Sequence, residues 1–184
     1  PAAAPPPAEG GCLTACGASA IYQADLFREL GGFDERFFCY CEDVDLGFRL
    51  QLAGEDCMFL RRAIVRHAGG GIAGQSSAFA TFHGTRNRIW TYAKNMPLPL
   101  LLPTLPGHAA LTLYVLARNV FTPRFGPMVR GLMEGLRGLP QILGSFYWRE
   151  TQRKLGLWTL ARRMAWNPLR MSRRLPHVRP VTGR

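Results

Sequence analysis

Acidic side chains are scarce in this sequence, whose 184 residues include 12 Asp and Glu against 23 Lys and Arg, for a formal net charge of +11. Such a basic balance predicts an anionic partner, which a membrane surface, a phosphorylated substrate or a nucleic acid would each provide. No recognised nucleic-acid-binding motif accompanies the charge, so a basic nucleic-acid-binding module is the least favoured of three interpretations and no nucleic acid is expected as a partner. A hydrophobic fraction of 47% excludes general disorder.

A hydrophobic run long enough to cross a bilayer is also lacking. The apolar stretch 109–117 is shorter than the roughly 20 residues of a spanning helix, and the stretch 98–121 reaches that length only by including prolines and His108. We expect the prolines to break any helix before Gly107 and the rest to form an interfacial or re-entrant helix. Farther on, arginines alternate with Leu, Met, Phe and Trp, which favours basic amphipathic helices on an anionic membrane surface. The alternative is a solvated helix face packed on the protein's own core.

Cysteine is present but without a metal-binding spacing. The five cysteines are Cys12, Cys16, Cys39, Cys41 and Cys57. A zinc site formed by the first four is an alternative, but C-x-x-x-C and C-x-C are not the usual knuckle spacings, so reduced, buried thiols are favoured. The glycine-rich segment 68–74 lacks the Lys-Ser/Thr of a phosphate-binding P-loop and is a weak signal.

The chain has no Met at its first position and no signal peptide before its folded part. We expect residues 1–11, rich in Pro and Ala, to be a disordered leader or a truncated linker, and the whole chain to be a fragment. The expected elements are a buried strand over 17–22, a short helix over 25–30, an aromatic loop or short helix over 33–40, a helix from 42 to about 53, extended segments over 57–60 and 63–66, and a helix over 76–95.

The few acids are concentrated in one place, because residues 31–46 hold five of them among aromatic side chains. Clustered carboxylates raise one another's pKa and need a cation or a hydrogen-bond network to stay ionised. This is the profile of a catalytic base beside a metal–phosphate site. The alternative is capping of a helix N-terminus, which accounts for one acid but not for the whole block.

The block GGFDERFFCYCEDVDLGFRLQLAG, residues 31–54, resembles the acceptor-side signature of the family 2 inverting glycosyltransferases of the GT-A fold. The similarity is greatest to the bacterial rhamnosyltransferase-like branch. The resemblance implies an α/β fold in which residues 12–96 form the acceptor-side half of a GT-A domain. Residues 97–184 would then form a helical, basic, membrane-proximal region.

The resemblance also assigns roles to individual residues. An inverting sugar transfer needs a carboxylate to take the proton of the acceptor hydroxyl, and the family's base falls on Asp43, with Glu42 beside it in the catalytic pair. The residues expected to bind or orient the acceptor are Asp34, Glu35, Phe38, Tyr40 and Asp45.

The leaving nucleotide diphosphate would need positive charge to neutralise it. Arg86, in an Arg-Asn pair typical of this branch, is the expected diphosphate ligand, although a helix-surface arginine is the alternative. His67 follows the second extended segment after the Glu-Asp pair, where the family can complete a metal site. The expected cofactor is a divalent metal, either Mn²⁺ or Mg²⁺.

The resulting hypothesis is a glycosyltransferase that moves a sugar, with inversion, from a nucleotide-diphosphate donor to a cell-surface polysaccharide or lipid-linked acceptor. It would act peripherally at the cytoplasmic face of a bacterial inner membrane. The family's donor-binding half should precede residue 17, so this piece alone is expected to be inactive. A non-catalytic membrane-associated remnant or subunit is the second interpretation.

Overall fold

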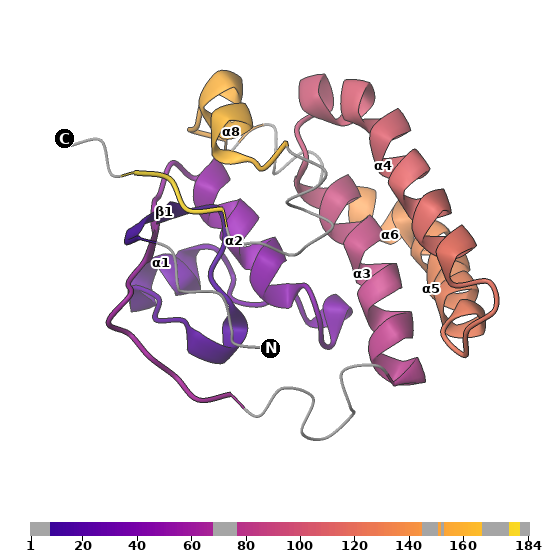
Figure 1. Cartoon of the computed structure of the whole chain (residues 1–184). Helices are drawn as coiled ribbons and strands as arrows, with labels where there is room; N and C mark the ends of the chain where they lie inside the picture. The colour runs from indigo at the N-terminus through magenta and orange to yellow at the C-terminus, as the bar shows by residue number, and fades with distance from the viewer. Residues whose placement is uncertain (1–7, 68–76, 145–150, 152, 167–176, 181–184) are drawn as a thin grey trace.

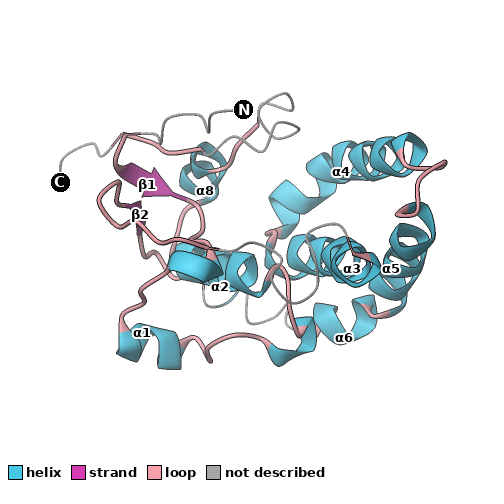
Figure 2. Cartoon of the chain, turned by 60° about the horizontal axis from the view of Figure 1, so that its bottom comes forward, coloured by secondary structure: helices cyan, strands magenta, loops and turns pink. Residues whose placement is uncertain are grey.

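The computed structural model describes residues 8–67, 77–144, 151, 153–166 and 177–180, and its long helix α3 (Ala78–Asn95) lies at the centre. Helix α2 (Glu42–Leu52) lies on one side of α3, with α4 and α5 on the other (Figures 1 and 2). The remaining elements are β1 (Gly10–Cys12), 3-10 helix η1 (Gly17–Ser19), α1 (Ala24–Glu29), 3-10 helix η2 (Glu35–Phe37), β2 (Cys57–Phe59), α4 (Leu98–Arg118), α5 (Phe125–Arg137), α6 (Leu139–Leu143) and α8 (Leu157–Arg163).

The β-structure of the described residues is one small antiparallel sheet. Strand β1 pairs with β2 in a register that sets Gly10 opposite Phe59 and Cys12 opposite Cys57. The extended segment predicted over 57–60 is therefore confirmed as β2, whereas residues 63–66 form no strand. The prediction of a disordered leader is wrong for Gly10 and Gly11, which belong to β1, and residues 1–7 of that segment lie outside the described part.

The buried strand predicted over residues 17–22 is wrong. The segment begins with η1, and Ile21 is fully exposed. A strand needs a neighbour to pair its backbone groups, and here the backbone N–H of Gly17 donates instead to the carboxylate of Asp43. Residues 17–22 therefore form a surface segment whose first residue, Gly17, contacts the start of α2.

The two predicted helices on either side of the aromatic segment are confirmed. Helix α1 is followed by Gly31 and Gly32, both with positive φ. Helix α2 carries three acids in its first turn, where they favour the positive end of the helix dipole, and Gly54 at φ +92° follows its end. Residues 45–52 are all buried, so α2 is a core helix rather than an amphipathic helix with one face exposed to solvent.

Helix α3 is confirmed close to its predicted range. The hydroxyl of Ser77 accepts from the backbone N–H of Ala80 at 3.1 Å and so caps its N-terminus. Trp90 of α3 packs with Phe37 of η2 and Ile142 of α6 in the hydrophobic core. The aromatic segment is thereby anchored on α3.

The prediction that prolines break the helix before Gly107 is wrong, because α4 runs unbroken through Pro103 and Pro106. Its packing on α3 gives the physical reason. The Tyr92 hydroxyl donates to the carbonyl of Leu101 at 2.8 Å, and the Tyr92 ring stacks on His108 with centroids 4.1 Å apart. These contacts hold α4 against α3 on either side of the prolines, and this packing offsets a penalty that would be about 3 kcal/mol for each proline in an isolated helix.

Helix α4 is also the one helix in the described residues that is long and apolar enough to cross a membrane by length and composition. Its best 18-residue window has a mean hydropathy of 1.5, and 6% of that window is buried against the protein. It lies along one edge of the molecule in both views (Figures 1 and 2). The apolar side of the predicted membrane-proximal region is therefore largely uncovered within the described chain.

Candidate active site

The segment between α1 and α2 has an unusual backbone, and we call residues 33–41 the aromatic loop. Phe38, Tyr40 and Cys41 all have φ between 63° and 66°, in the left-handed region that non-glycine residues rarely adopt. Each such residue costs on the order of 1 kcal/mol or more and persists only where its surroundings hold it. Cys41 is the N-cap of α2, so the strained backbone leads directly into the Glu42–Asp43 pair.

Asn87 of α3 holds this loop. Its side-chain nitrogen lies 2.9 Å from the carbonyl oxygen of Phe37 and 2.7 Å from those of Cys39 and Tyr40. Asn87 is completely buried. One amide thus links three carbonyls of a turn that has lost regular backbone pairing, which explains why the turn is stable in the folded protein.

Arg86 lies beside Asn87 and contacts the same loop. Its Nη2 donates to the carbonyl of Phe37 at 2.9 Å, its Nε donates to Asn87 Oδ1 at 2.8 Å, and its guanidinium carbon lies 4.3 Å from the centroid of Trp90. Burial lowers its pKa. Part of the predicted diphosphate ligand is therefore engaged in positioning the loop, and diphosphate binding stays a prediction.

Asp43 occupies the second position of α2 and is half-buried. Its Oδ2 accepts from Gly17 N at 2.7 Å, and its Oδ1 accepts from Val44 N at 2.8 Å. A Cβ at position 17 would lie 3.3 Å from the Cβ of Asp43, so glycine permits this close approach. The carboxylate is oriented by two backbone donors and keeps lone pairs for a further proton.

Glu42 differs from its neighbour. Burial raises its pKa, a backbone hydrogen bond opposes the rise, and the charge of Asp43 adds to it. Its Oε2 is buried without a hydrogen-bond partner among the described residues, as is the hydroxyl of Tyr22. Burial also raises the pKa of Tyr22, and Asp43 adds to that rise, which places the phenol in the same electrostatic environment. No motif in the sequence marks Tyr22 as a functional residue.

Asp34 and Asp45 lie on the inner side of the loop, in an ion-pair network. The ammonium group of Lys94 in α3 lies 2.6 Å from Asp34 and 2.8 Å from Asp45. Arg49, one turn along α2, pairs with Asp45 at 2.8 Å, and Asp45 has no exposed surface. Both acids were predicted to bind the acceptor, and the structure places them where they tie the loop, α2 and α3 together.

The outer side of the loop presents aromatic rings. Phe38 is 74% exposed and lies edge-on to Phe79 of α3, with centroids 6.3 Å apart. Tyr40 contacts the same ring, and His83 packs on Phe79 at 4.4 Å. Phe38 and Tyr40 were predicted to meet the acceptor. The spacing of Phe79 and His83, four residues apart, sets them on one helix face, but only the fold brings that face to the loop.

Glu35 and His67 are both exposed, and Glu35 is the first residue of η2. In the described part of the chain, no group of three or more His, Cys, Asp or Glu side chains is placed to hold a metal ion. The zinc alternative for the cysteines falls with this finding, and the described cysteines are free. His67 by itself does not form a divalent-metal site, and its role as a metal ligand stays a prediction.

Two curated proteins match part of this chain. Both are named N-acetylglucosaminyl-diphospho-decaprenol L-rhamnosyltransferase, from two strains of Mycobacterium tuberculosis, CDC 1551 / Oshkosh and ATCC 25618 / H37Rv. Each is 45% identical to this chain over 51 residues, which are 28% of the chain and 17% of the relative. The comparison therefore supports a glycosyltransferase relationship over a short stretch of the relatives' length.

No protein-family model matches the sequence, and no solved structure matches it. The expected GT-A fold stays a prediction. The described residues supply helices and one two-stranded sheet around the acid pair.

Proposed function

We propose that this chain carries the acceptor side of a sugar-transferring enzyme, with Asp43 as general base. The observation that supports it most is the exposed side of the aromatic loop, where an oriented carboxylate follows a strained backbone and aromatic rings face solvent. Strain of this kind is concentrated at functional sites. The identity to two rhamnosyltransferases gives the chemical class.

In this proposal Asp43 takes the proton of an acceptor hydroxyl as that oxygen attacks the anomeric carbon of a nucleotide-activated sugar. The N–H groups of Gly17 and Val44 hold the carboxylate in place, so that little reorganisation is needed when the proton arrives. Phe38, Tyr40 and Phe79 provide flat apolar faces on which a sugar ring of the acceptor stacks. A divalent metal would need ligands in addition to His67, since the described residues hold no group of three or more His, Cys, Asp or Glu side chains placed to bind one.

Glu42 has a separate role in the proposal. Burial raises its pKa, and its buried Oε2 has no hydrogen-bond partner among the described residues. In the proposal this carboxyl group orients the acceptor, while Asp43 takes the proton.

The acceptor is proposed to be a lipid-linked glycan at a membrane, in line with the printed name of the relatives. The uncovered apolar surface of α4 supports contact with a bilayer, as does the formal net charge of +11. The proposed location is peripheral, at the cytoplasmic face of a bacterial inner membrane, where anionic lipids attract a basic protein.

Replacing the base tests the proposal. In the full-length protein, we expect Asp43→Asn to lower sugar transfer by about 10²-fold or more while leaving donor affinity unchanged. The measurement is release of nucleoside diphosphate from a rhamnose nucleotide in the presence of an N-acetylglucosaminyl-diphospho-lipid.

The matched control is Asp25→Asn, because Asp25 is an exposed acid of α1 that pairs only with Arg28 in the described contacts. It removes the same charge away from the site and should leave transfer unchanged. Turnover that is unaltered in Asp43→Asn would contradict the assignment of the base, and the chain would then fit the non-catalytic interpretation.

A further inference from the structure

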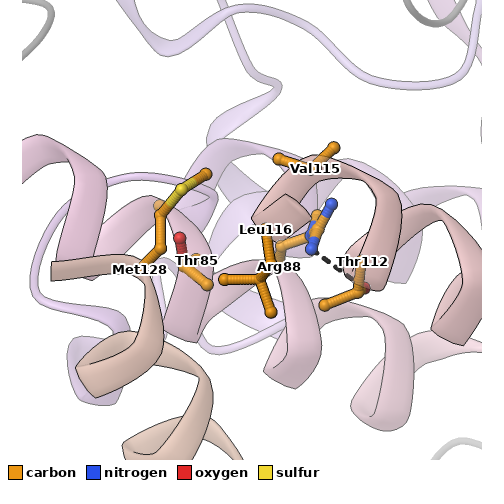
Figure 3. A pocket seen from close by; sticks show the side chains of 7 residues that line it. Thr85, Arg88, Thr112, Val115, Leu116 and Met128 are labelled. Carbon is orange, nitrogen blue, oxygen red and sulfur yellow. Dashed lines mark hydrogen bonds between the residues drawn. The ribbon is translucent and has the colours of Figure 1, made fainter. Parts of the chain in front are cut away.

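A small cavity lies where α3, α4 and α5 meet. It has a volume of about 120 Å³, the space of about four water molecules at ~30 Å³ each. Figure 3 shows that its walls combine polar side chains of α3 and α4, Arg88 and Thr112 among them, with the apolar side chains of Val115, Leu116 and Met128. The space suits a group the size of a phosphate rather than a whole sugar.

Arg88 gives the cavity its charge. One Nη2–H bond reaches the hydroxyl of Thr112 at 3.0 Å, and no carboxylate in the described part of the chain pairs with this guanidinium. Arg88 is half-buried, and this partial burial lowers its pKa. A half-buried cation is less fully hydrated than an exposed one, so an anion that enters the cavity gains more from Arg88 than it would from an exposed arginine.

The threonine hydroxyls that line the cavity have no proton free to donate to an anion. Thr112 Oγ donates to the carbonyl of His108 at 2.8 Å, and Thr85 Oγ donates to the carbonyl of Thr81 at 2.8 Å. A hydroxyl has a single proton, so both are committed to their own helices. The guanidinium, with five N–H donors, is the group that can bind an anion, and its planar geometry matches two oxygens of a phosphate.

The cavity and the candidate active site share helix α3. Asn87, the residue before Arg88, binds the carbonyls of Cys39 and Tyr40 in the aromatic loop. Burial and the charges of Asp43 and Glu42 raise the pKa of Cys41 to about 11, and the positive charge of Arg88 opposes that rise. Arg88 therefore lies on the same helix that holds the loop.

We propose that this cavity binds a phosphate group of a membrane lipid, with Arg88 as its ligand and α4 in contact with the lipid chain. The lipid is favoured as the source because α4, which forms one wall, has 6% of its most apolar window buried and carries exposed Leu113 and Tyr114. The choice of a lipid rests on the proposed function, where the acceptor is lipid-linked. The assignment of phosphate rests on Arg88 and the cavity alone.

Vesicle binding tests the site without any sugar transfer. The chain is titrated with phosphatidylcholine vesicles that contain either phosphatidic acid or phosphatidylserine at equal surface charge, and binding is measured by co-sedimentation. We expect the chain to bind vesicles with phosphatidic acid more tightly than vesicles with phosphatidylserine. In Arg88→Gln the ratio of the two affinities should fall by about tenfold. Arg137→Gln removes the same charge from an exposed position on α5 and should keep the preference.

Two further variants make the outcome specific. Arg88→Lys keeps the charge without the planar donor pair and should keep a reduced preference, which separates phosphate binding from misfolding when Arg88→Gln melts early. Asp43→Asn should bind vesicles as the wild type does, so that failure of the lipid site and failure of the proposed base are seen in different variants.

Two results would contradict the proposed lipid-phosphate site. Equal weakening by Arg88→Gln and Arg137→Gln would mean diffuse attraction of a basic surface and would overturn the site. Thermal stabilisation by inorganic pyrophosphate that depends on Arg88, with no preference for phosphatidic acid, would overturn the lipid source and assign the cavity to a soluble phosphate.

Discussion

Cys12 and Cys57 face each other across β1 and β2 with their sulfur atoms 3.2 Å apart. Their hydrogen bond lowers the pKa of the Cys12 thiol, burial opposes that shift, and the charge of Arg179 adds to it. The same hydrogen bond and burial raise the pKa of Cys57. Within this pair, we therefore expect the thiolate to form on Cys12.

We expect Cys12 to react with iodoacetamide at a lower pH than Cys57, because the thiolate is the nucleophile. Mass spectrometry of labelled peptides across a pH series measures this directly. In Cys57→Ala the hydrogen bond is absent, so the midpoint for Cys12 should move to higher pH. A midpoint that does not move would contradict the hydrogen bond as the cause.

The acids show how far single letters predict a role. Asp43 and Asp45 are two residues apart in the same first turn, yet one is half-buried beside Gly17 and the other is fully buried between Arg49 and Lys94. The sequence predicted a helix that begins at residue 42 and therefore has both aspartates near its N-terminus, and this prediction is confirmed. The packing of α3 decides which carboxylate is partly exposed to solvent and which pairs with a buried cation. The position of α3 cannot be predicted from a local sequence pattern.

At the scale of elements, α5 packs closely on α3 through glycines. A Cβ added at Gly131 would lie 2.5 Å from the carbonyl oxygen of Phe82, and one added at Gly135 would lie 2.7 Å from Ile89. These distances are shorter than any ordinary contact, so the two helices approach only because the side chains are missing. Gly126, on the same helix, has open space around it.

We expect Gly131→Ala to lower the free energy of unfolding by about 1–3 kcal/mol, since the backbone of α3 would have to move. Gly126→Ala should instead leave stability unchanged or raise it by up to about 1 kcal/mol, because alanine favours the helix. Urea denaturation of both variants measures the difference. Equal effects of the two substitutions would contradict the close approach of α5 to α3.

Helix α4 illustrates an element whose sequence signal was misleading. Prolines at positions 103 and 106 predict a break by their own chemistry, since they lack an N–H donor. The hydroxyl of Tyr92 and the ring of His108 come from two different helices and meet only after packing. Tertiary contacts therefore overrode a local preference that was correctly identified.

At the scale of the whole molecule, the network around Lys94 joins the aromatic loop, α2 and α3. Burial alone would raise the pKa of Asp34, but hydrogen bonds from Arg36 and Lys94 outweigh it and hold that pKa well below its usual range. The folded state therefore binds a proton at Asp34 less readily than the unfolded state does. Its contribution to stability is complete above the unfolded pKa of about 3.8 and is lost as the pH falls below it.

We expect the free energy of unfolding to fall more steeply below pH 4 in the wild type than in Asp34→Asn, which has no proton to bind at this position. Urea unfolding at a series of pH values measures the slope. Asp25→Asn, which changes an exposed acid, should keep the wild-type slope. A slope that is the same in all three proteins would remove Asp34 from the acid response.

Several local features of this protein follow from its amino-acid sequence alone: the glycines that end α1 and α2, the long helix α3 and the acid pair at the start of α2. Each depends on residues close together in the chain, so propensity and capping suffice to predict it. Other features depend on how distant segments pack. The strained loop held by Asn87, the burial of Asp45 and the unbroken α4 all depend on partners about ten to fifty residues away, whose meeting is a property of packing rather than of any local pattern.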